Sequence, residues 1–177
     1  MGSSVGLSKA HDAAELDAAI DLALSYDEEI LVEEMIVGRE IEVAVLGSLH
    51  PEVSLPGEVV PAAEFYSYAD KYEDGAAQLL APAPLSDAAT ESVRDLARRA
   101  FAACRCDGMA RVDCFYDEGG RGFLVNELNT IPGFTPISMY PRLWEVSGLA
   151  YPALLDRLIQ LAIERHDRRT ARAGRQR

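Results

Sequence analysis

The chain has 177 residues, enough for one domain or slightly more, and 49% of them are hydrophobic, so it can bury a core. Its formal charge of −12 excludes a general nucleic-acid binder, because an acidic surface is repelled by phosphate. No apolar run approaches the ~18 residues of a membrane span, and the small polar start does not resemble a secretory signal. Cys104, Cys106 and Cys114 lack the spacing of a zinc site or a disulfide framework, which favours reduced thiols in a cytoplasm.

The start of the chain contains one predicted helix and one predicted strand. Residues 12–26 have helical periodicity, with Asp12 as the N-cap and Glu15 completing a capping-box pattern. Residues 29–34 follow as a predicted short strand.

Two further strands precede a long irregular segment. Residues 40–46 alternate as a strand whose odd-numbered residues are apolar, and residues 49–56 form a strand that Pro51 places at a sheet edge. Residues 57–85 are rich in proline, alanine and aromatic residues and have little periodicity, which predicts a long loop with a functional role.

The second half contains three predicted helices around a hairpin. Ser86 caps a helix that ends near Cys104, a short helix spans residues 138–146, and the last helix begins at Pro152 with an apolar face. Its inward residues are predicted to be Leu154, Leu155, Leu158, Ile159, Ala162 and Ile163. The arginine-rich residues 166–177 are predicted to be a disordered basic tail. Antiparallel strands with interspersed helices indicate an α+β fold.

The hairpin between these helices carries the most informative pattern. Residues 109–116 and 122–129 are predicted strands joined by a Gly-rich turn. A turn centred on Gly120 places four polar residues on one face, as two adjacent cross-strand pairs: Arg111, Asp113, Glu127 and Asn129. Nearer the turn this face continues as Phe115, Phe123 and Val125, and the other face is Ala110, Val112, Cys114, Leu124 and Leu128.

Two carboxylates and an amide oxygen form a hard-oxygen site suited to magnesium. The neighbouring Arg111 can stabilise charge that develops on a phosphoryl or acyl group. The alternative interpretation is a solvated sheet edge, but the apolar opposite face indicates a half-buried sheet with a local acidic site.

Several segments together resemble the D-alanine–D-alanine ligases, a branch of the ATP-grasp superfamily. The most specific segment reads Asn126-Glu127-Leu128-Asn129-Thr130-Ile131-Pro132-Gly133-Phe134-Thr135, and the others are residues 2–9, 33–40, 68–72, 108–113 and 136–141. The resemblance implies that residues 1–33 are a remnant of the central ATP-grasp subdomain. Residues 34–165 would then be the C-terminal ATP-grasp subdomain, with a mainly antiparallel sheet flanked by helices. The N-terminal domain and most of the central domain would be missing partners of this C-terminal part.

The family joins two D-alanines for peptidoglycan precursor synthesis, using ATP to form an acyl phosphate. The resemblance implies two magnesium ions, which manganese can replace, held by Asp113, Glu127 and Asn129. It implies that Arg111 stabilises the tetrahedral oxyanion, and that Ser3 and Tyr72 help to close a loop over the site. It implies nucleotide contacts for Glu33, Glu34, Ile36, Glu40, Lys71 and Ser4, and substrate contacts for Ser138, Met139 and Gly133.

The resemblance also sets expectations for the isolated chain. Lysines and first-substrate residues that lie upstream in the family are absent here, so the chain alone is expected to lack ligase activity. Tyr72 favours D-alanine over lactate as the second substrate, and a homodimer is a further expectation for the longer protein. Two alternatives stay open: another ATP-grasp carboxylate–amine ligase with a different amino acid, and a non-catalytic nucleotide-binding module.

Overall fold

The computed structural model describes residues 5–61, 77–135 and 137–173. The chain divides into two compact units, the first formed by Met1–Ile36 with Pro61–Gln78 and the second by Val37–Val60 with Leu79–Arg177. Across the described ranges no single helix is long and apolar enough to cross a membrane. Two consecutive helical segments, Met139–Val146 and Tyr151–Arg172, are long and apolar enough only when they are taken together, and a bend of 106° separates them.

The first unit contains helix α1 (Ala13–Leu24), which confirms the predicted helix. Asp12 is the N-cap, and its Oδ1 accepts a hydrogen bond of 2.9 Å from Glu15 N. Glu15 Oε2 reaches back to His11 N at 2.7 Å, one residue before the N-cap, and this backbone hydrogen bond is the main cause that lowers the pKa of Glu15. The predicted strand at residues 29–34 is wrong, because that segment has no regular secondary structure. A strand needs a hydrogen-bonded neighbour, and Leu31 is 86% exposed.

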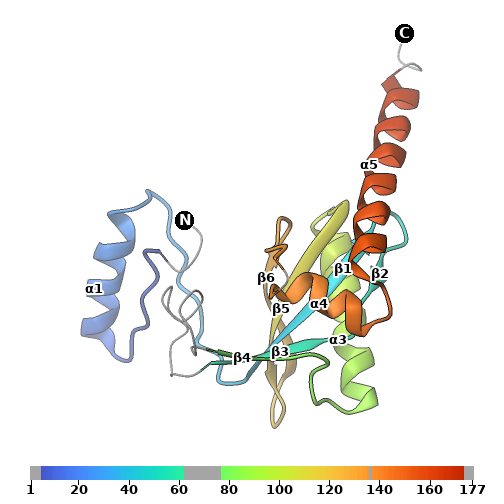
Figure 1. Cartoon of the computed structure of the whole chain (residues 1–177). Helices are drawn as coiled ribbons and strands as arrows, with labels where there is room; N and C mark the ends of the chain where they lie inside the picture. The colour runs from blue at the N-terminus through green and yellow to red at the C-terminus, as the bar shows by residue number, and fades with distance from the viewer. Residues whose placement is uncertain (1–4, 62–76, 136, 174–177) are drawn as a thin grey trace. The chain divides into compact units, whose positions relative to one another are not determined.

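The sheet is antiparallel in all the strand pairs whose register is described, and its order is β4-β3-β1-β5-β6, with β2 pairing β1 (Figure 1). Its strands are β1 (Arg39–Gly47), β2 (Glu52–Val53), β3 (Gly57–Pro61), β4 (Ala77–Leu80), β5 (Gly108–Asp117) and β6 (Gly122–Asn129). The α+β prediction is confirmed. The prediction of one loop over residues 57–85 is wrong at its ends, where β3 and β4 pair in the sheet.

One face of the sheet packs on helix α3 (Asp87–Ala103). Ser86 caps this helix as predicted, since its Oγ accepts from Ala89 N at 3.2 Å. The alternation predicted for β1 is confirmed, because Ile41, Val43 and Val45 are fully buried in the core that this helix helps to form. The core contains Ile41, Val43, Val45, Val93, Ala97, Phe101, Ala110, Val112 and Cys114. We call this side of the sheet the core face.

Helix α4 (Met139–Val146) covers part of the opposite face of the sheet. Gly57 pairs with Glu42, and a Cβ at Gly57 would lie 2.8 Å from Leu143 Cδ2 and 2.9 Å from Met139 Sδ. Facing residues of an antiparallel pair share a side of the sheet, so α4 packs on the side of β1 that carries Glu42. This helix therefore lies next to the polar end of the hairpin described below.

Tyr140 anchors α4 to the central strand. Its side chain is fully buried, and its hydroxyl donates a hydrogen bond of 2.9 Å to Val45 O. Burial raises the pKa of Tyr140, because the phenolate would lose its hydration.

The Tyr140→Phe variant should lose about 1–2 kcal/mol of stability at pH 7, because Val45 O loses its donor in a buried place. The folded-state pKa lies above that of the unfolded chain, so the full contribution is present below about pH 10 and is lost as pH rises further. Above about pH 10, the free energy of unfolding of the parent should therefore fall by up to about 1.4 kcal/mol per pH unit relative to that of the variant. Urea unfolding of both proteins from pH 7 to 11 measures this difference, and parallel curves across the range would contradict it.

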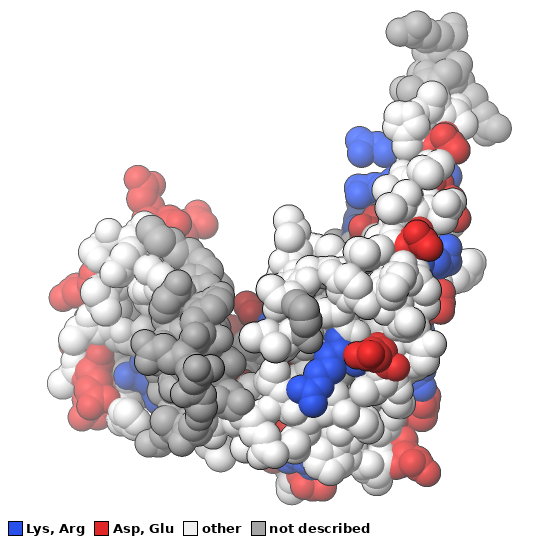
Figure 2. Space-filling model, viewed as in Figure 1, with Lys and Arg blue, Asp and Glu red and all other residues white. Residues whose placement is uncertain are grey.

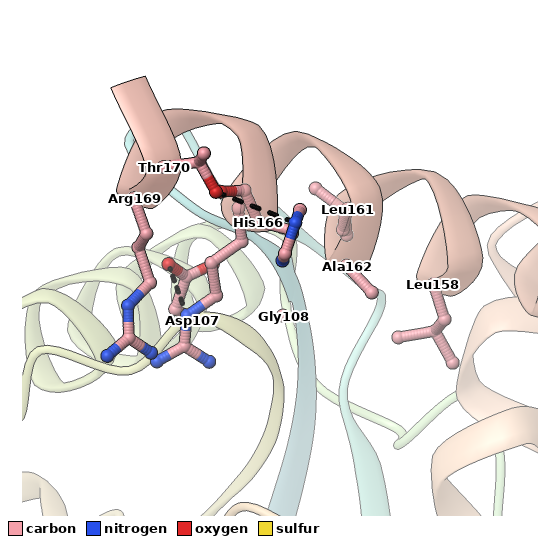
Figure 3. Close-up of a pocket in the computed structure, with 9 residues that line it drawn as sticks. Asp107, Gly108, Leu158, Leu161, Ala162, His166, Arg169 and Thr170 are labelled. Atoms are coloured by element: carbon pink, nitrogen blue, oxygen red, sulfur yellow. Dashed lines mark hydrogen bonds and ion pairs between the residues drawn. The ribbon is translucent and has the colours of Figure 1, made fainter. Parts of the chain in front are cut away.

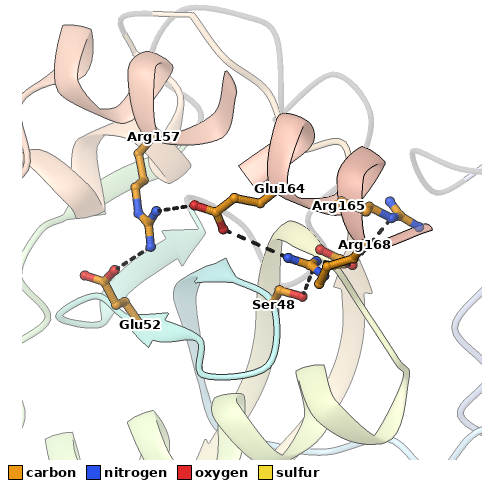
Figure 4. Close-up of polar contacts among 7 residues, drawn as sticks. Ser48, Glu52, Arg157, Glu164, Arg165 and Arg168 are labelled. Carbon is orange, nitrogen blue, oxygen red and sulfur yellow. Dashed lines mark hydrogen bonds and ion pairs between the residues drawn. The ribbon is translucent and has the colours of Figure 1, made fainter. Parts of the chain in front are cut away.

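Helix α5 (Tyr151–Ala173) continues through the first eight residues of the predicted disordered tail, which corrects that prediction. A chain of polar contacts explains the extension (Figure 4). Arg168 bonds to Ser48 Oγ at 2.9 Å and lies 3.4 Å from Asp107 Oδ2, and Arg165 lies 3.4 Å from the same oxygen. The predicted inward face is also partly wrong. Leu154 and Leu161 are buried, but Leu155, Ile159 and Ile163 are exposed.

Helix α3 ends in a Schellman motif with an arginine in the left-handed position. Arg105 has φ +52°, Cys106 N donates to Phe101 O at 3.0 Å, and Arg105 N donates to Ala102 O at 3.0 Å. Glycine is the residue that adopts this conformation without strain. The Arg105→Gly variant should therefore be more stable by about 0.5–1 kcal/mol, measured by urea unfolding. An Arg105→Ala variant is the control, and a gain of the same size in that variant would contradict the conformational explanation.

Candidate functional site

The predicted pairing of the polar hairpin residues is confirmed. In the register of β5 and β6, Arg111 faces Asn129 and Asp113 faces Glu127. Facing Cβ atoms in such pairs lie about 4.5–5.5 Å apart. Two carboxylates, an amide and a guanidinium are therefore brought together at the end of the hairpin away from its turn.

A β-bulge between this end and the turn was not predicted. Asp113 faces Glu127, but the next residue, Cys114, faces Val125, so Asn126 is an extra residue in β6. If the strands paired regularly from the observed turn, Asp113 would face Asn126 instead. The bulge allows the hairpin to have this turn and still place Asp113 opposite Glu127. Bulges occur frequently beside functional sites.

The bulge also reverses the predicted faces near the turn. Phe123 faces Tyr116 on the core face, where the two rings stack with centroids 4.0 Å apart, and Val125 faces Cys114 there. Leu124 faces Phe115 instead. The prediction that Phe123 and Val125 share the polar face is wrong, because the extra residue shifts the alternation by one position.

Arg111 is held tightly by carboxylates in the site. Its Nε donates to Asp113 Oδ1 at 2.7 Å and its Nη2 donates to Asp113 Oδ2 at 2.7 Å, which is a bidentate pair. Its Nε also lies 3.3 Å from Glu42 Oε2. Burial by itself lowers the pKa of Arg111. The hydrogen bonds to Asp113 and the charges of Glu42, Asp113 and Glu127 outweigh that effect and raise the pKa above its ordinary value, so the guanidinium stays charged.

Glu42 is a site residue that the sequence did not single out. It faces Asp113 across β1 and β5, so Glu42, Asp113 and Glu127 form a line across three strands. We call these three residues the carboxylate row. The available signal was the alternation of Glu40, Ile41 and Glu42, which indicates a polar face but not which residues lie opposite it.

The donor set of the hairpin fits magnesium in its chemistry. Asp113, Glu127 and Asn129 offer only hard oxygen atoms, and Mg²⁺ takes few protein ligands and keeps several waters. Asn129 Oδ1 already accepts a bond of 3.1 Å from Ile131 N, which leaves it a second lone pair. No group of three His, Cys, Asp or Glu side chains that could hold a metal ion occurs in the described parts of the chain. The fit therefore rests on two carboxylates and an amide.

The turn after β6 brings together the predicted substrate-binding residues Gly133 and Ser138. Ser138 is the N-cap of α4, but its side chain makes no cap hydrogen bond to that helix. Its Oγ accepts instead from Thr135 N at 3.0 Å and lies 2.8 Å from Thr135 Oγ1. A Cβ at Gly133 would lie 2.8 Å from Ser138 Oγ, so only glycine permits this approach. Met139, the first residue of α4, is buried.

The remaining predicted residues lie elsewhere in the chain. Glu40 lies on β1 two residues before Glu42, and so on the same face of that strand. Glu33, Glu34 and Ile36 belong to the first unit, in a segment without regular secondary structure. Four predicted residues lie outside the described ranges: Ser3, Ser4, Lys71 and Tyr72.

Two cavities lie away from the carboxylate row. The larger, of about 610 Å³, lies between α5 and the start of β5, and Figure 3 shows its lining side chains. It is lined by Asp107, Gly108, Leu158, Leu161, Ala162, Arg165, His166, Arg169 and Thr170. Basic side chains gather along α5 in Figure 2. The second, of about 480 Å³, lies beside Tyr116 and Phe123 on the core face. Neither contains a predicted site residue.

Comparison with known proteins gives consistent matches. A profile of the family described as D-ala D-ala ligase C-terminus matches residues 1–160. The D-alanine–D-alanine ligase of Solibacter usitatus is 52% identical over 166 residues, covering 94% of this chain and 51% of the relative. The structure of the D-alanine–D-alanine ligase from Coxiella burnetii has a TM-score of 0.87 and 42% identity, covering 98% of this chain and 46% of that one.

A ligase named for a different second substrate also matches. The VanG D-Ala:D-Ser ligase of Enterococcus faecalis has a TM-score of 0.81 and 39% identity, and the match covers 90% of this chain and 46% of that protein. The chain spans about half the length of the curated relatives it matches. The α+β arrangement of sheet and helices is shared with these ligases. The extent of the profile match shows that the chain belongs to the D-alanine–D-alanine ligase family, within the ATP-grasp fold.

Proposed function

We propose that this chain supplies the magnesium–ATP face and the oxyanion arginine of a D-alanine–D-alanine ligase. In that reaction ATP phosphorylates the carboxylate of one D-alanine, and the amine of a second attacks the acyl phosphate. The observation that carries the proposal is the cross-strand pair of Asp113 and Glu127, with Arg111 and Asn129 beside it on the same hairpin.

The hairpin residues have distinct proposed roles. Asp113, Glu127 and Asn129 would hold two magnesium ions, and manganese could take their place. When bound, the metal neutralises phosphate charge and aligns the phosphoryl group for transfer. Arg111 stabilises the oxyanion that forms when the amine attacks, because its raised pKa keeps it charged throughout.

Further nucleotide contacts are proposed on each unit separately. Glu40 binds the ribose hydroxyls, and Glu33 binds the adenine edge together with the backbone of Glu34 and Ile36. Ser4 and Lys71 bind phosphate. Ser3 and Tyr72 close a loop that protects the acyl phosphate from water. Support for these roles comes from the sequence resemblance to the family, and all of these positions lie within the residues 1–160 that the family profile matches.

The second amino acid binds at the start of α4. Ser138 Oγ and the backbone N–H of Met139 bind its carboxylate at a helix N-terminus, which favours anions, and Gly133 leaves room for the close approach of Ser138. D-Alanine is the proposed second substrate. D-Serine is the alternative, because the VanG D-Ala:D-Ser ligase shares the fold at 39% identity.

The reaction needs the rest of a ligase, so the proposed partner is the part of the relatives that this chain does not cover. The chain alone is proposed to bind nucleotide without forming D-alanyl-D-alanine. The complete ligase is proposed to act in the cytoplasm, where it joins D-alanines for peptidoglycan precursor synthesis, and to form a homodimer.

Calorimetry with ATP in the presence of Mg²⁺, and again with EDTA, tests the nucleotide function of this chain. Magnesium-dependent binding is expected, because the carboxylates of the hairpin repel the triphosphate unless a cation lies between them. ATP binding of equal strength in both titrations would contradict the proposed metal site. The absence of binding in both would contradict the nucleotide function of the chain.

A further inference from the structure

Glu42 lies where it can control the direction of the Arg111 guanidinium. It is one of three carboxylates in the row, and its Oε2 lies 3.3 Å from Arg111 Nε. The side chains of Glu42 and Arg111 are 13% and 20% exposed, so water screens their attraction less than it would at a surface. Glu42 is not among the residues to which the proposed function gives a role.

The bidentate bond between Arg111 and Asp113 cannot persist unchanged in the proposed reaction. Both oxygens of Asp113 accept hydrogen bonds from Arg111, yet Asp113 is a proposed metal ligand. Oxygen atoms that bind a cation become poor acceptors for a second positive group, because both cations compete for the same lone pairs. Arg111 therefore needs another anchor when the metal occupies Asp113.

We infer that Glu42 is a positioning residue that holds the Arg111 guanidinium in the site when Asp113 binds metal. Glu42 is suited to this role because it faces Asp113 from β1 and contacts Nε of Arg111, which leaves the terminal nitrogens available to the reacting group. The inference rests on the proposed function, since it assigns Arg111 and Asp113 the roles given above. The contact between Glu42 and Arg111 does not involve Asp113, so it can be tested in the absence of nucleotide.

The Nε–H signal of Arg111 in the ¹⁵N NMR spectrum gives a direct test on this chain. In the absence of nucleotide, Asp113→Ala should keep a signal that is protected from solvent exchange, because Glu42 remains. The double variant Asp113→Ala with Glu42→Ala should lose it. The Nε–H signal of Arg39, which bonds to Glu58 on the core face, should stay unchanged in both and shows that the fold is intact. An unchanged Arg111 signal in the double variant would overturn the inference.

Addition of magnesium and ATP separates positioning from metal binding. The parent should keep the protected Arg111 signal, and Glu42→Ala alone should lose it while its affinity for magnesium–ATP stays within about threefold of the parent value. A loss of affinity of more than about 100-fold would make Glu42 a metal ligand and overturn the inference. If the parent does not bind magnesium–ATP, the proposed function fails, and the nucleotide-free comparison still decides the role of Glu42.

Discussion

Replacing Glu127 with alanine should lower the affinity of this chain for magnesium–ATP by more than about 100-fold, because even residues that only support metal ligands contribute 10- to 100-fold. Glu127 is exposed, and it faces Asp113 across the hairpin. Its loss should therefore change the free energy of unfolding by less than about 0.5 kcal/mol. Asp113→Ala should lose affinity to the same extent. It should also cost about 1 kcal/mol of stability, since Arg111 loses a charged partner.

Glu118→Ala is the matched control for these variants. Glu118 lies in the turn of the same hairpin with a 68% exposed side chain, so its removal changes the net charge equally but leaves the carboxylate row intact. Calorimetry should give parent-like affinity for this variant. An equal loss in all three variants would mean that the hairpin acts only through its total charge, which the account does not predict.

Replacing Glu58 with alanine should cost about 2–3 kcal/mol of stability, less than the ~3–5 kcal/mol of a fully buried broken pair. Glu58 accepts two bonds of 2.8 Å from Arg39 and is 9% exposed in its side chain. The variant leaves the Arg39 guanidinium without its main partner. Arg39 is 28% exposed and keeps a bond to Pro84 O, which reduces the cost. Urea unfolding at pH 7 measures the loss.

Two comparison variants show whether an unpaired charge is the cause. The double variant Arg39→Met with Glu58→Met removes both charges and should lie within about 1 kcal/mol of the parent. Asp95→Ala breaks an exposed pair with Arg99 on α3 and should cost less than about 1 kcal/mol. If the double variant is as unstable as Glu58→Ala, the cost comes from packing and not from an unpaired guanidinium.

The candidate site was largely predictable because its pattern is local. Strand alternation and a Gly-rich turn determine which residues of one hairpin face each other, and the Asp113–Glu127 pair follows from these two facts. The bulge at Asn126 was not predictable. It depends on how the four turn residues form their backbone hydrogen bonds. It moves Phe123 to the other face of the sheet without changing the Asp113–Glu127 pair.

The errors in the fold arise where distant parts of the chain decide the structure. β3 and β4 carry little periodicity and are strands because they pair in the sheet, whereas residues 29–34 have a strand pattern without a paired neighbour. The end of α5 is helical where Arg168 contacts Ser48 and Asp107, which lie 120 and 61 residues away in the chain. Glu42 was missed for the same reason, since its contact with Arg111 joins two strands that a long segment separates.

The central claim is that the polar face of the β5–β6 hairpin binds a divalent cation together with ATP. Manganese relaxes nearby NMR signals, so a titration of the ¹⁵N-labelled chain with Mn²⁺ and ATP locates the cation directly. The amide signals of Asp113, Glu127 and Asn129 should broaden first, and those of His166 and Thr170, at the cavity beside α5, should persist. Broadening that begins at the cavity, or that spares the hairpin, would show that the hairpin does not bind the cation.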